Sequence, residues 1–331
     1  MKLFITGGAG FIGSNFIRYI LANYPDYEIV NFDKLTYCGN LENLKDVENN
    51  PRHKFVRGDI VDRAAIDAAI ASADAVINFA AETHIDRSIL EPEAFLKTNV
   101  FGVYNLLEAV RTHNIGRMIQ ISTDEVYGHV EEGESDEGAP YLPRSPYAAS
   151  KAAADHLAHA YFVTYGTPVI ITHSCNVYGP YQYPEKLIPL FATNLLEGKK
   201  IPVYGDGMQI REWIFTADIC RALDAVLHRG QIGEVYNIGT GHRAPNIDIT
   251  KKILTLLEKD EFSIVYVKDR PGHDRRYALN HQKISRELGW EPQISFDDGL
   301  RETVFWYKKN EDWWKKIKSG EYLEYYKRQY G

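Results

Sequence analysis

The chain has 331 residues, of which 44% are hydrophobic and 25% charged, and its formal net charge is -7 at pH 7. A mildly acidic chain of ordinary composition lacks the concentrated basic surface of a nucleic-acid binder, so we expect no nucleic-acid partner. Its three dispersed cysteines form no CxxC pair, so we expect no metal and no disulfide. No apolar run reaches about 18 residues and the N-terminus enters a glycine-rich turn at once, which predicts a cytoplasmic protein without signal peptide or membrane contact.

In chain order, short apolar strands alternate with helical stretches through the first half of the sequence. Strands are predicted at residues 3–6, 28–32, 54–57, 75–79, 118–122 and 169–172, and helices at 11–23, 63–71, 94–113 and 147–165. This alternation predicts an α/β fold built on a doubly wound parallel sheet of the Rossmann type. After residue 173 turn-rich segments interrupt the pattern. We therefore expect one domain at 1–173 and a smaller mixed α/β domain at 174–331, part of whose chain can return to the sheet.

A glycine-rich motif, TGGAGFIG, follows the first predicted strand. Gly7, Gly10 and Gly13 would let the backbone approach a pyrophosphate at the N-terminus of the next helix. The spacing is GxxGxxG, and alone such a turn also has a purely structural interpretation. Asp33 follows 20 residues after Gly13, at the end of the second strand, where a carboxylate accepts a hydrogen bond from a ribose 2′-hydroxyl. Together these features favour NAD, while the neighbouring Lys34 leaves NADP open.

Two further motifs carry chemistry. Tyr147 and Lys151 lie four residues apart, so they project from one face of a predicted helix. A nearby ammonium favours the phenolate, and a phenolate is a general base that takes a hydroxyl proton while the carbon loses hydride to a nicotinamide. The stretch STDEVYG (122–128) places Asp124 and Glu125 at the tip of a buried strand. Two adjacent acids push their proton affinities apart, so that one donates while the other accepts; a helix-capping turn is the structural alternative.

Taken together, these motifs resemble the extended short-chain dehydrogenase/reductase family and, within it, the dTDP-glucose 4,6-dehydratases. The resemblance covers nearly the whole chain and includes LTYCGNLENL (35–44), FAAETHIDRSI (79–89), NVYGPYQYPEKLIPL (176–190), VYGDG (203–207) and DRPGHDRRYALN (269–280). It implies a tightly bound NAD that is regenerated in each cycle, and conversion of dTDP-glucose to dTDP-4-keto-6-deoxyglucose and water. It also implies a homodimer in which the helices near 94–113 and 147–165 pair across a two-fold axis.

The resemblance also implies roles for individual residues. Tyr147, aided by Lys151, would take the proton from the sugar O4, Glu125 would remove the C5 proton, and Asp124 would protonate O6, with Thr123 bonded near O4. The NAD-binding residues would be Gly7, Gly10, Phe11, Ile12, Gly13, Asp33, Lys34, Leu35, Thr36, Asp59, Ile60, Phe79, Ala80, Ala81, Thr98, Tyr147, Lys151 and Val177. The nucleotide-sugar-binding residues would be Thr83, Thr123, Asn176, Lys186, Leu187, Pro202, Val203, Tyr204, Arg211, Asn246, Arg270 and His273.

Some positions depart from the motifs that the chain resembles. His173 stands where an arginine is usual, and Val177 where a second asparagine is usual. Because these changes border the nucleotide and cofactor pockets, UDP-glucose or UDP-N-acetylglucosamine is an alternative substrate. An NAD-dependent C4 epimerase, which needs the tyrosine but no acid pair, and a catalytically silent NAD-binding regulator are further alternatives. Arg211 is either a diphosphate ligand or the ion-pair partner of Glu212 or another acid. His84 is expected to be a structural hydrogen bonder, and residues 131–137 are expected to form a solvated acidic loop.

Overall fold

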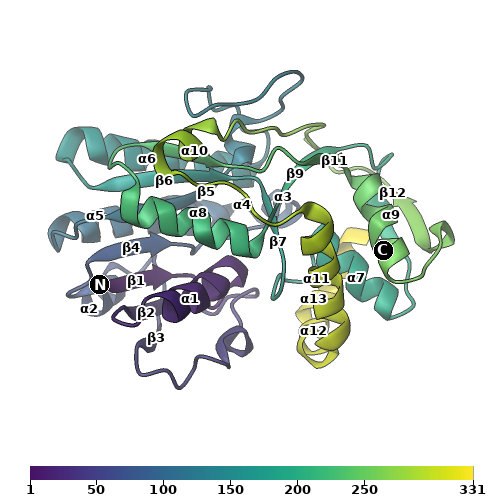
Figure 1. The fold of residues 1–331 in the computed structure, drawn as a ribbon, viewed down its shortest axis with the longest axis horizontal. Helices are drawn as coiled ribbons and strands as arrows, with labels where there is room; N and C mark the ends of the chain where they lie inside the picture. The colour runs from purple at the N-terminus through teal and green to yellow at the C-terminus, as the bar shows by residue number, and fades with distance from the viewer. Residues whose placement is uncertain (331) are drawn as a thin grey trace.

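The computed structural model describes residues 1–330, and its centre is a parallel sheet of seven strands (Figure 1). The sheet order is β10-β6-β5-β4-β1-β2-β3. The strands are β1 (Lys2–Thr6), β2 (Glu28–Asp33), β3 (His53–Arg57), β4 (Ala75–Asn78), β5 (Met118–Thr123), β6 (Val169–Ser174) and β10 (Val235–Ile238). The chain winds outward from β1 in both directions, so the predicted doubly wound α/β fold is confirmed.

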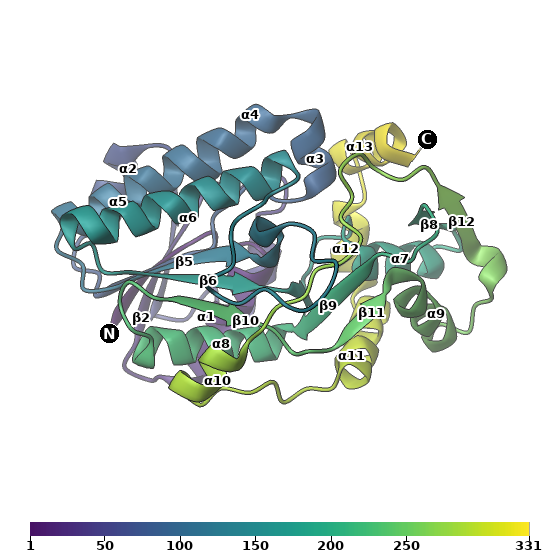
Figure 2. The same cartoon turned by 90° about the horizontal axis from the view of Figure 1, so that it is seen from above.

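Helices cover both faces of this sheet, as Figure 2 shows from above. One layer holds α1 (Phe11–Asn23), α8 (Thr216–Arg229) and α10 (Gln282–Leu288), and the other holds α2 (Arg63–Ile70), α5 (Val103–Thr112) and α6 (Pro146–Tyr165). The strands carry apolar side chains on both faces because both are covered, and each layer closes its own hydrophobic core.

Local sequence signals fix the ends of α6, the helix that carries Tyr147 and Lys151. The Ser145 side chain accepts a hydrogen bond from the Ala148 amide at 3.1 Å, and Pro146 occupies the first turn. At the other end Gly166 adopts a left-handed conformation with φ 68° and closes the helix.

The prediction of one regular helix over residues 94–113 is wrong. The structure has α3 (Ile85–Leu90), α4 (Pro92–Phe95), a π-helix η2 (Leu96–Gly102) and then α5. The widened turn places Asn99 inward, where its amide donates to the Glu82 carbonyl at 3.0 Å and to Ser150 Oγ at 2.9 Å. These contacts compensate for the irregular turn and tie it to the cavity wall and to α6.

The second half of the chain builds a smaller unit beside the carboxyl ends of the strands. It contains a three-stranded sheet of β7 (Asn176–Tyr178), β9 (Ile210–Phe215) and β11 (Arg243–Pro245), and a pair of β8 (Ile201–Tyr204) with β12 (Ile264–Val267). Its helices are α7 (Leu187–Leu196), α9 (Asn246–Leu256), α11 (Phe296–Lys309), α12 (Glu311–Ile317) and α13 (Glu321–Tyr330), and it contains the 3-10 turn η4 (Glu261–Ser263). Two other 3-10 turns, η1 (Leu41–Leu44) and η3 (Asp124–Tyr127), belong to the first half of the chain. β10 is an edge strand of the large sheet, and α10 covers one face of that sheet. The chain therefore crosses between the two units more than once.

The acidic stretch 131–137 is exposed at residues 131–134 and 136, as expected for a solvated loop, but it is also anchored to the body of the protein. Ser135 is buried, and its amide donates to the Ala278 carbonyl at 2.9 Å. Glu137 Oε1 accepts from the Asn237 amide at 2.9 Å, and Glu134 pairs with Arg243 at 2.8 Å. The loop therefore packs on the edge strand β10 and on residues that follow β12, which no local sequence pattern shows.

Within residues 1–330, no helix has the length and apolar character needed to cross a bilayer. In the same range, no group of three or more His, Cys, Asp or Glu side chains is arranged to hold a metal ion, and Cys38, Cys175 and Cys220 are free thiols.

Candidate active site

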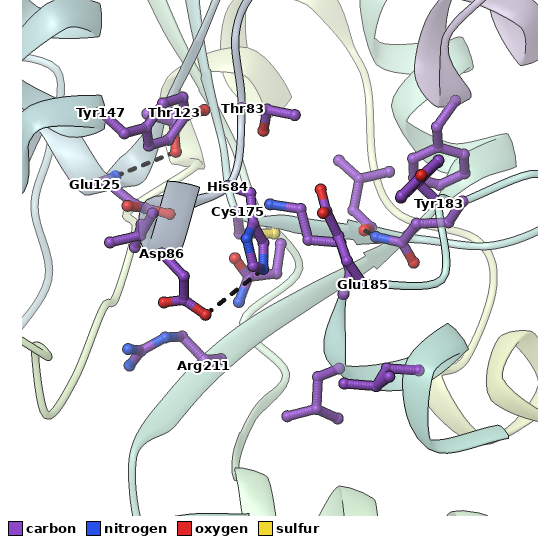
Figure 3. Close-up of a pocket in the computed structure, with 18 of the residues that line it drawn as sticks. Thr83, His84, Asp86, Thr123, Glu125, Tyr147, Cys175, Tyr183, Glu185 and Arg211 are labelled. Carbon is purple, nitrogen blue, oxygen red and sulfur yellow. Dashed lines mark hydrogen bonds and ion pairs between the residues drawn. The ribbon is translucent and has the colours of Figure 1, made fainter. Parts of the chain in front are cut away.

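A large cavity lies where the carboxyl ends of the central strands meet the smaller unit, and Figure 3 shows part of its lining. A smaller cavity adjoins it, and the two share wall residues, among them Gly7, Cys38 and Phe79. Crevices at this edge of a doubly wound sheet are where such folds bind ligands. Among the described residues that line the two cavities, every predicted site residue is present except Leu35 and Asp124.

The cofactor half is formed by the first glycine turn and the ends of β2 and β3. Gly7 has φ +69°, and a Cβ there would lie 2.5 Å from the Ala80 amide nitrogen, so only glycine allows this close approach. Asp33 accepts from the amides of Ala9 at 2.9 Å and Leu35 at 2.7 Å. The side chain of Leu35 does not face either cavity, and its backbone instead orients the carboxylate.

Charges around the smaller cavity bear on the choice between NAD and NADP. Lys34 Nζ lies 2.7 Å from Asp59 Oδ2, so the ammonium that would attract a 2′-phosphate is already paired. Asp33 lines the same cavity as a second acidic side chain. A concave glycine turn facing a buried carboxylate fits a dinucleotide with a free 2′-hydroxyl.

The acid pair lies at the start of η3, directly after β5. Thr123 Oγ1 donates to Asp124 Oδ1 at 3.2 Å. It also accepts from the Glu125 amide at 3.4 Å, a contact dashed in Figure 3, so the threonine fixes the turn. Asp124 Oδ2 and Glu125 Oε2 are both buried and have no hydrogen-bond partner among the described residues. An unpaired buried carboxyl oxygen is costly unless a ligand or a proton satisfies it.

Environment separates the two acids. Burial and the neighbouring Glu125 raise the pKa of Asp124 well above its usual range. Burial also raises the pKa of Glu125, but the cations of Arg270, Lys186 and Arg211 oppose this. Asp124 is therefore the acid that keeps its proton, and Glu125 is the one that ionises.

Tyr147 and Lys151 both lie within the site, and burial shifts the pKa of each away from the charged form. Burial, followed by the charges of Glu125 and Asp124, raises the pKa of Tyr147, while hydrogen bonds from Thr123 and Thr83 oppose the rise. Lys151 Nζ donates to the Ile121 carbonyl at 2.6 Å, and burial lowers its pKa to about 8. The acid pair therefore opposes the phenolate form of Tyr147, which the Lys151 ammonium is predicted to favour.

The other end of the large cavity is cationic. Arg211 donates to the carbonyls of Ile210 at 2.8 Å and Asp274 at 2.9 Å, and it does not pair with Glu212, whose partner is Arg243 at 2.8 Å. The alternative of an Arg211–Glu212 ion pair is therefore excluded. The wall of the same cavity also contains Pro202, Val203 and Tyr204 of β8, together with Leu187, Asn176 and Val177.

Two further groups at this end have unfilled hydrogen-bonding capacity. Arg270 pairs with Asp86 at 3.0 Å, yet its Nε is buried without a partner within residues 1–330. Asn246 Oδ1 is likewise buried and unpaired in the described part of the chain. His273 is held by Asp269 at 2.6 Å, and burial lowers its pKa to about 4, so it is neutral near pH 7. Such groups suit a ligand with phosphate and hydroxyl oxygens.

The structure adds residues that sequence reasoning missed. Glu185 is buried and accepts from Tyr37 at 2.8 Å and from Arg87 at 2.8 Å. The Arg87 guanidinium lies between the rings of Tyr37, at 3.7 Å, and Tyr325, at 4.2 Å. We call this group, Tyr37, Arg87, Glu185 and Tyr325, the cavity clasp, because it joins four segments around the cavity. His84 accepts or donates at Nδ1 to Tyr325, in line with its predicted structural role.

Known proteins share this fold and sequence. The family model described as GDP-mannose 4,6 dehydratase matches residues 4–303. A dTDP-glucose 4,6-dehydratase of Neisseria meningitidis serogroup B is 50% identical over 346 residues, with 97% of each chain covered. The crystal structure of DesIV, a dTDP-glucose 4,6-dehydratase from Streptomyces venezuelae with NAD bound, matches with TM-score 0.94 and 50% identity over 96% of this chain and 100% of that one. A UDP-glucose 4-epimerase from Thermotoga maritima has TM-score 0.87 at 29% identity, over 93% and 99% of the two chains.

The fold and the site together define an NAD-dependent enzyme of the extended short-chain dehydrogenase/reductase class. The chain belongs to the GDP-mannose 4,6 dehydratase family and, within it, to the group of dTDP-glucose 4,6-dehydratases, which confirms the predicted resemblance.

Proposed function

We propose that this protein converts dTDP-glucose to dTDP-4-keto-6-deoxyglucose and water. The observation that carries the proposal is the buried pair Asp124 and Glu125 beside Tyr147. Asp124 Oδ2 and Glu125 Oε2 are buried and have no hydrogen-bond partner within residues 1–330. Oxidation at C4, the part of the reaction shared with epimerases, needs a base at O4 but no acid pair. Elimination of water needs both an acid for the leaving oxygen and a base for the carbon-bound proton.

The first half of the chain supplies the cofactor site. Gly7, Gly10 and Gly13 form the turn for the pyrophosphate, and Asp33 accepts from the ribose. When bound there, NAD supplies the hydride acceptor for C4 and later the hydride donor for C6. DesIV, the structural relative with NAD bound, supports this assignment.

The chain's own groups move the protons. Tyr147 takes the O4 proton, and Glu125 removes the C5 proton that the new 4-ketone has made acidic. Asp124 protonates O6, so that water leaves across C5 and C6, and Glu125 then returns its proton to C5. At the end Tyr147 holds one proton more and Asp124 one fewer, so a proton passes between them before the next cycle. Asp124 does not itself line the cavity but is bonded to the lining residue Thr123, and its approach to O6 is part of this proposal.

The cationic end would bind the nucleotide. Arg211 and Arg270 are placed for the diphosphate, Asn246 for the ribose, and β8 for the base, since its apolar side chains suit a thymine methyl group. A uracil nucleotide is the alternative, because one methyl changes binding by only about 1–3 kcal/mol.

The homodimer and the cytoplasmic location are part of this proposal. Large apolar side chains are exposed on the helices predicted to pair, at Leu96, Phe101, Tyr104, Val163 and Tyr165. A contiguous exposed apolar surface on two neighbouring helices supports an interface between two copies. Light scattering checks it: twice the chain mass is expected for the parent and the monomer mass for Phe101→Glu.

One experiment tests the reaction. Purified protein is incubated with dTDP-glucose without added NAD, and the product mass is recorded. Loss of one water supports a dehydratase that keeps its cofactor, whereas a mass-neutral product indicates an epimerase. Absence of product from dTDP-linked and UDP-linked hexoses alike would overturn the proposal.

A further inference from the structure

Asp86 is a buried carboxylate in the wall of the large cavity, and neither the proton transfers nor the ligand contacts proposed above involve it. It lies in the first turn of α3, in the segment that follows β4, so it belongs to the half of the chain that holds the cofactor site. Figure 3 shows it among the side chains that line the cavity. A carboxylate with only 2% of its side chain exposed is costly to bury unless donors satisfy both of its oxygens.

Both oxygens of Asp86 are bonded to residues of the smaller unit. Oδ1 accepts from Arg270 Nη1 at 3.0 Å, and Oδ2 accepts from the Tyr204 hydroxyl at 2.9 Å. These partners lie 184 and 118 residues away along the chain. Both line the same cavity, Arg270 from the loop after β12 and Tyr204 from the end of β8. One carboxylate therefore connects the two halves of the site.

The ion pair with Arg270 is made through Nη1 of the guanidinium. The Nε atom of the same group is buried and has no hydrogen-bond partner within residues 1–330. Nε and Nη2 form another edge of the planar guanidinium, and that edge can donate two parallel hydrogen bonds to two oxygens of a phosphate. The ion pair thus fixes the orientation of the guanidinium and leaves Nε for a ligand.

The contact with Tyr204 fixes an aromatic ring. The Tyr204 hydroxyl donates to Asp86 and accepts from Gln329 Nε2 at 2.6 Å, so the oxygen is held from two sides. The ring meets the His273 ring edge-on, with 6.0 Å between the two centroids. A phenol that is bonded through its hydroxyl and packed through its ring keeps one orientation. Tyr204 therefore presents a preformed surface in the cavity wall, which lowers the cost of ordering it when a ligand binds.

Asp86 carries its charge in this setting. Burial raises its pKa, but the surrounding groups, Arg270 and the Tyr204 hydroxyl among them, outweigh that effect and hold the pKa below its usual range. His84 Nε2 lies 3.8 Å from Oδ2, beyond hydrogen-bond distance, and this longer contact is dashed in Figure 3. The hydrogen bonds of Asp86 to described residues are thus those to Arg270 and Tyr204.

We propose that Asp86 is a positioning residue for nucleotide recognition: it holds the Arg270 guanidinium for the diphosphate and the Tyr204 ring for the nucleoside before the ligand enters. The proposal rests on the nucleotide-binding role proposed above for the cationic end of the cavity. Because Asp86 comes from the other half of the chain, it also fixes that end relative to the half that carries Tyr147.

An anion at this place has an electrostatic cost, since a diphosphate is negatively charged. Arg211 and Lys186 line the same cavity and supply positive charge besides that of Arg270. Repulsion and positioning predict opposite signs. Removing the charge of Asp86 strengthens nucleotide binding if repulsion dominates and weakens it if positioning dominates.

Equilibrium binding of thymidine diphosphate to the cofactor-containing protein, measured by isothermal titration calorimetry, tests this role. In Asp86→Asn, which keeps the size of the side chain but loses its charge, Kd should rise about 20-fold. In Asp86→Glu, which keeps the charge but displaces it by one methylene, Kd should rise about 10-fold. Asp297→Asn makes the same chemical change at the exposed ion pair with Lys252 and should leave Kd unchanged.

Two further measurements separate positioning from a general structural role. Arg270→Gln removes the main partner, so adding Asp86→Asn to it should weaken binding only as much as Tyr204→Phe does, about threefold. In steady-state kinetics, KM for the nucleotide sugar should rise with Kd, while kcat changes by less than about threefold. If Asp86→Asn does not fold, Asp86→Glu decides the question, because it keeps the buried ion pair.

Three results would overturn the proposal. Unchanged or tighter binding in Asp86→Asn would show that the carboxylate mainly repels the ligand. A parental Kd in Asp86→Glu would show that only the charge matters, and equal losses with and without Arg270 would show a general structural role. Calorimetry does not depend on turnover, so a protein that binds thymidine diphosphate but dehydrates no nucleotide sugar contradicts the proposed function alone. A protein that binds neither thymidine diphosphate nor uridine diphosphate contradicts both.

Discussion

The two ends of the large cavity differ in charge and in what supports them. The chemical end holds Asp124 and Glu125 on the rigid tip of β5. The nucleotide end holds Arg211 and Arg270 on β9 and on a loop after β12. Burial raises the pKa of Glu125, the base of the chemical end, yet the cations of the nucleotide end oppose that rise. The comparison teaches that binding and chemistry are electrostatically coupled, since the groups that would hold the diphosphate also decide which acid ionises.

Among the variants considered, Glu125→Gln should cause the largest loss of product formation. Without the base, elimination stops, so product formation falls by about 1000-fold, while C4 oxidation continues. We expect NADH absorbance to accumulate when the variant is mixed with dTDP-glucose, and a single-turnover experiment measures it. Glu131→Gln, on an exposed part of the neighbouring loop, is the control and should leave turnover unchanged. Product at the parental rate from Glu125→Gln would contradict the role of Glu125.

Arg211→Lys should damage the nucleotide end. A lysine keeps the charge but loses the planar fork that now bonds two carbonyls and lies over Tyr277 at 4.2 Å. We expect KM for the nucleotide sugar to rise about 50-fold, with a smaller decrease in kcat, in steady-state kinetics. Arg275→Lys, at an exposed ion pair with Asp206, is the matched control. A pure kcat defect would place Arg211 with the chemistry instead.

His84 lies between the two ends and links stability to pH. Burial lowers its pKa to about 4, below the value of about 6.5 in the unfolded chain. The unfolded state therefore binds an extra proton as pH falls, so stability is lost below about pH 6.5 and down to pH 4. Between pH 7.5 and pH 5 the loss is about 2 kcal/mol, measurable by urea denaturation. His84→Asn should remove that part of the pH dependence, and the exposed His159→Gln should not.

The base preference should give the smallest effect. An apolar pocket on β8 gains about 1 kcal/mol or slightly more from the thymine methyl, so kcat/KM for dTDP-glucose should exceed that for UDP-glucose by about 10-fold. Competition between the two substrates, followed by mass spectrometry, measures the ratio. Equal rates, or a preference for uracil, would show that the pocket does not contact the methyl group.

Local spacing explains why much of the site was predictable from sequence. The residues that the sequence identified lie a few positions from their motif partners or at the end of a strand. They are Gly7, Asp33, the pair Asp124 and Glu125, and the pair Tyr147 and Lys151. Their chemistry can therefore be inferred from spacing along the chain. Glu185 meets Arg87, 98 residues away, through tertiary packing that no local pattern contains. The π-helical turn at Asn99 and the packed 131–137 loop also depend on distant partners, as does the rise in the pKa of Tyr147.

The cavity clasp has a consequence for the lifetime of the bound cofactor. Tyr37 also contacts the Thr83 carbonyl at 3.2 Å, and its neighbour Cys38 lines both cavities, so the segment lies at their junction. We expect a dinucleotide bound at this junction to be released through separation of Arg87 from Glu185. Exchange with solution would then require a local opening of the protein, and its rate would follow the stability of that opening.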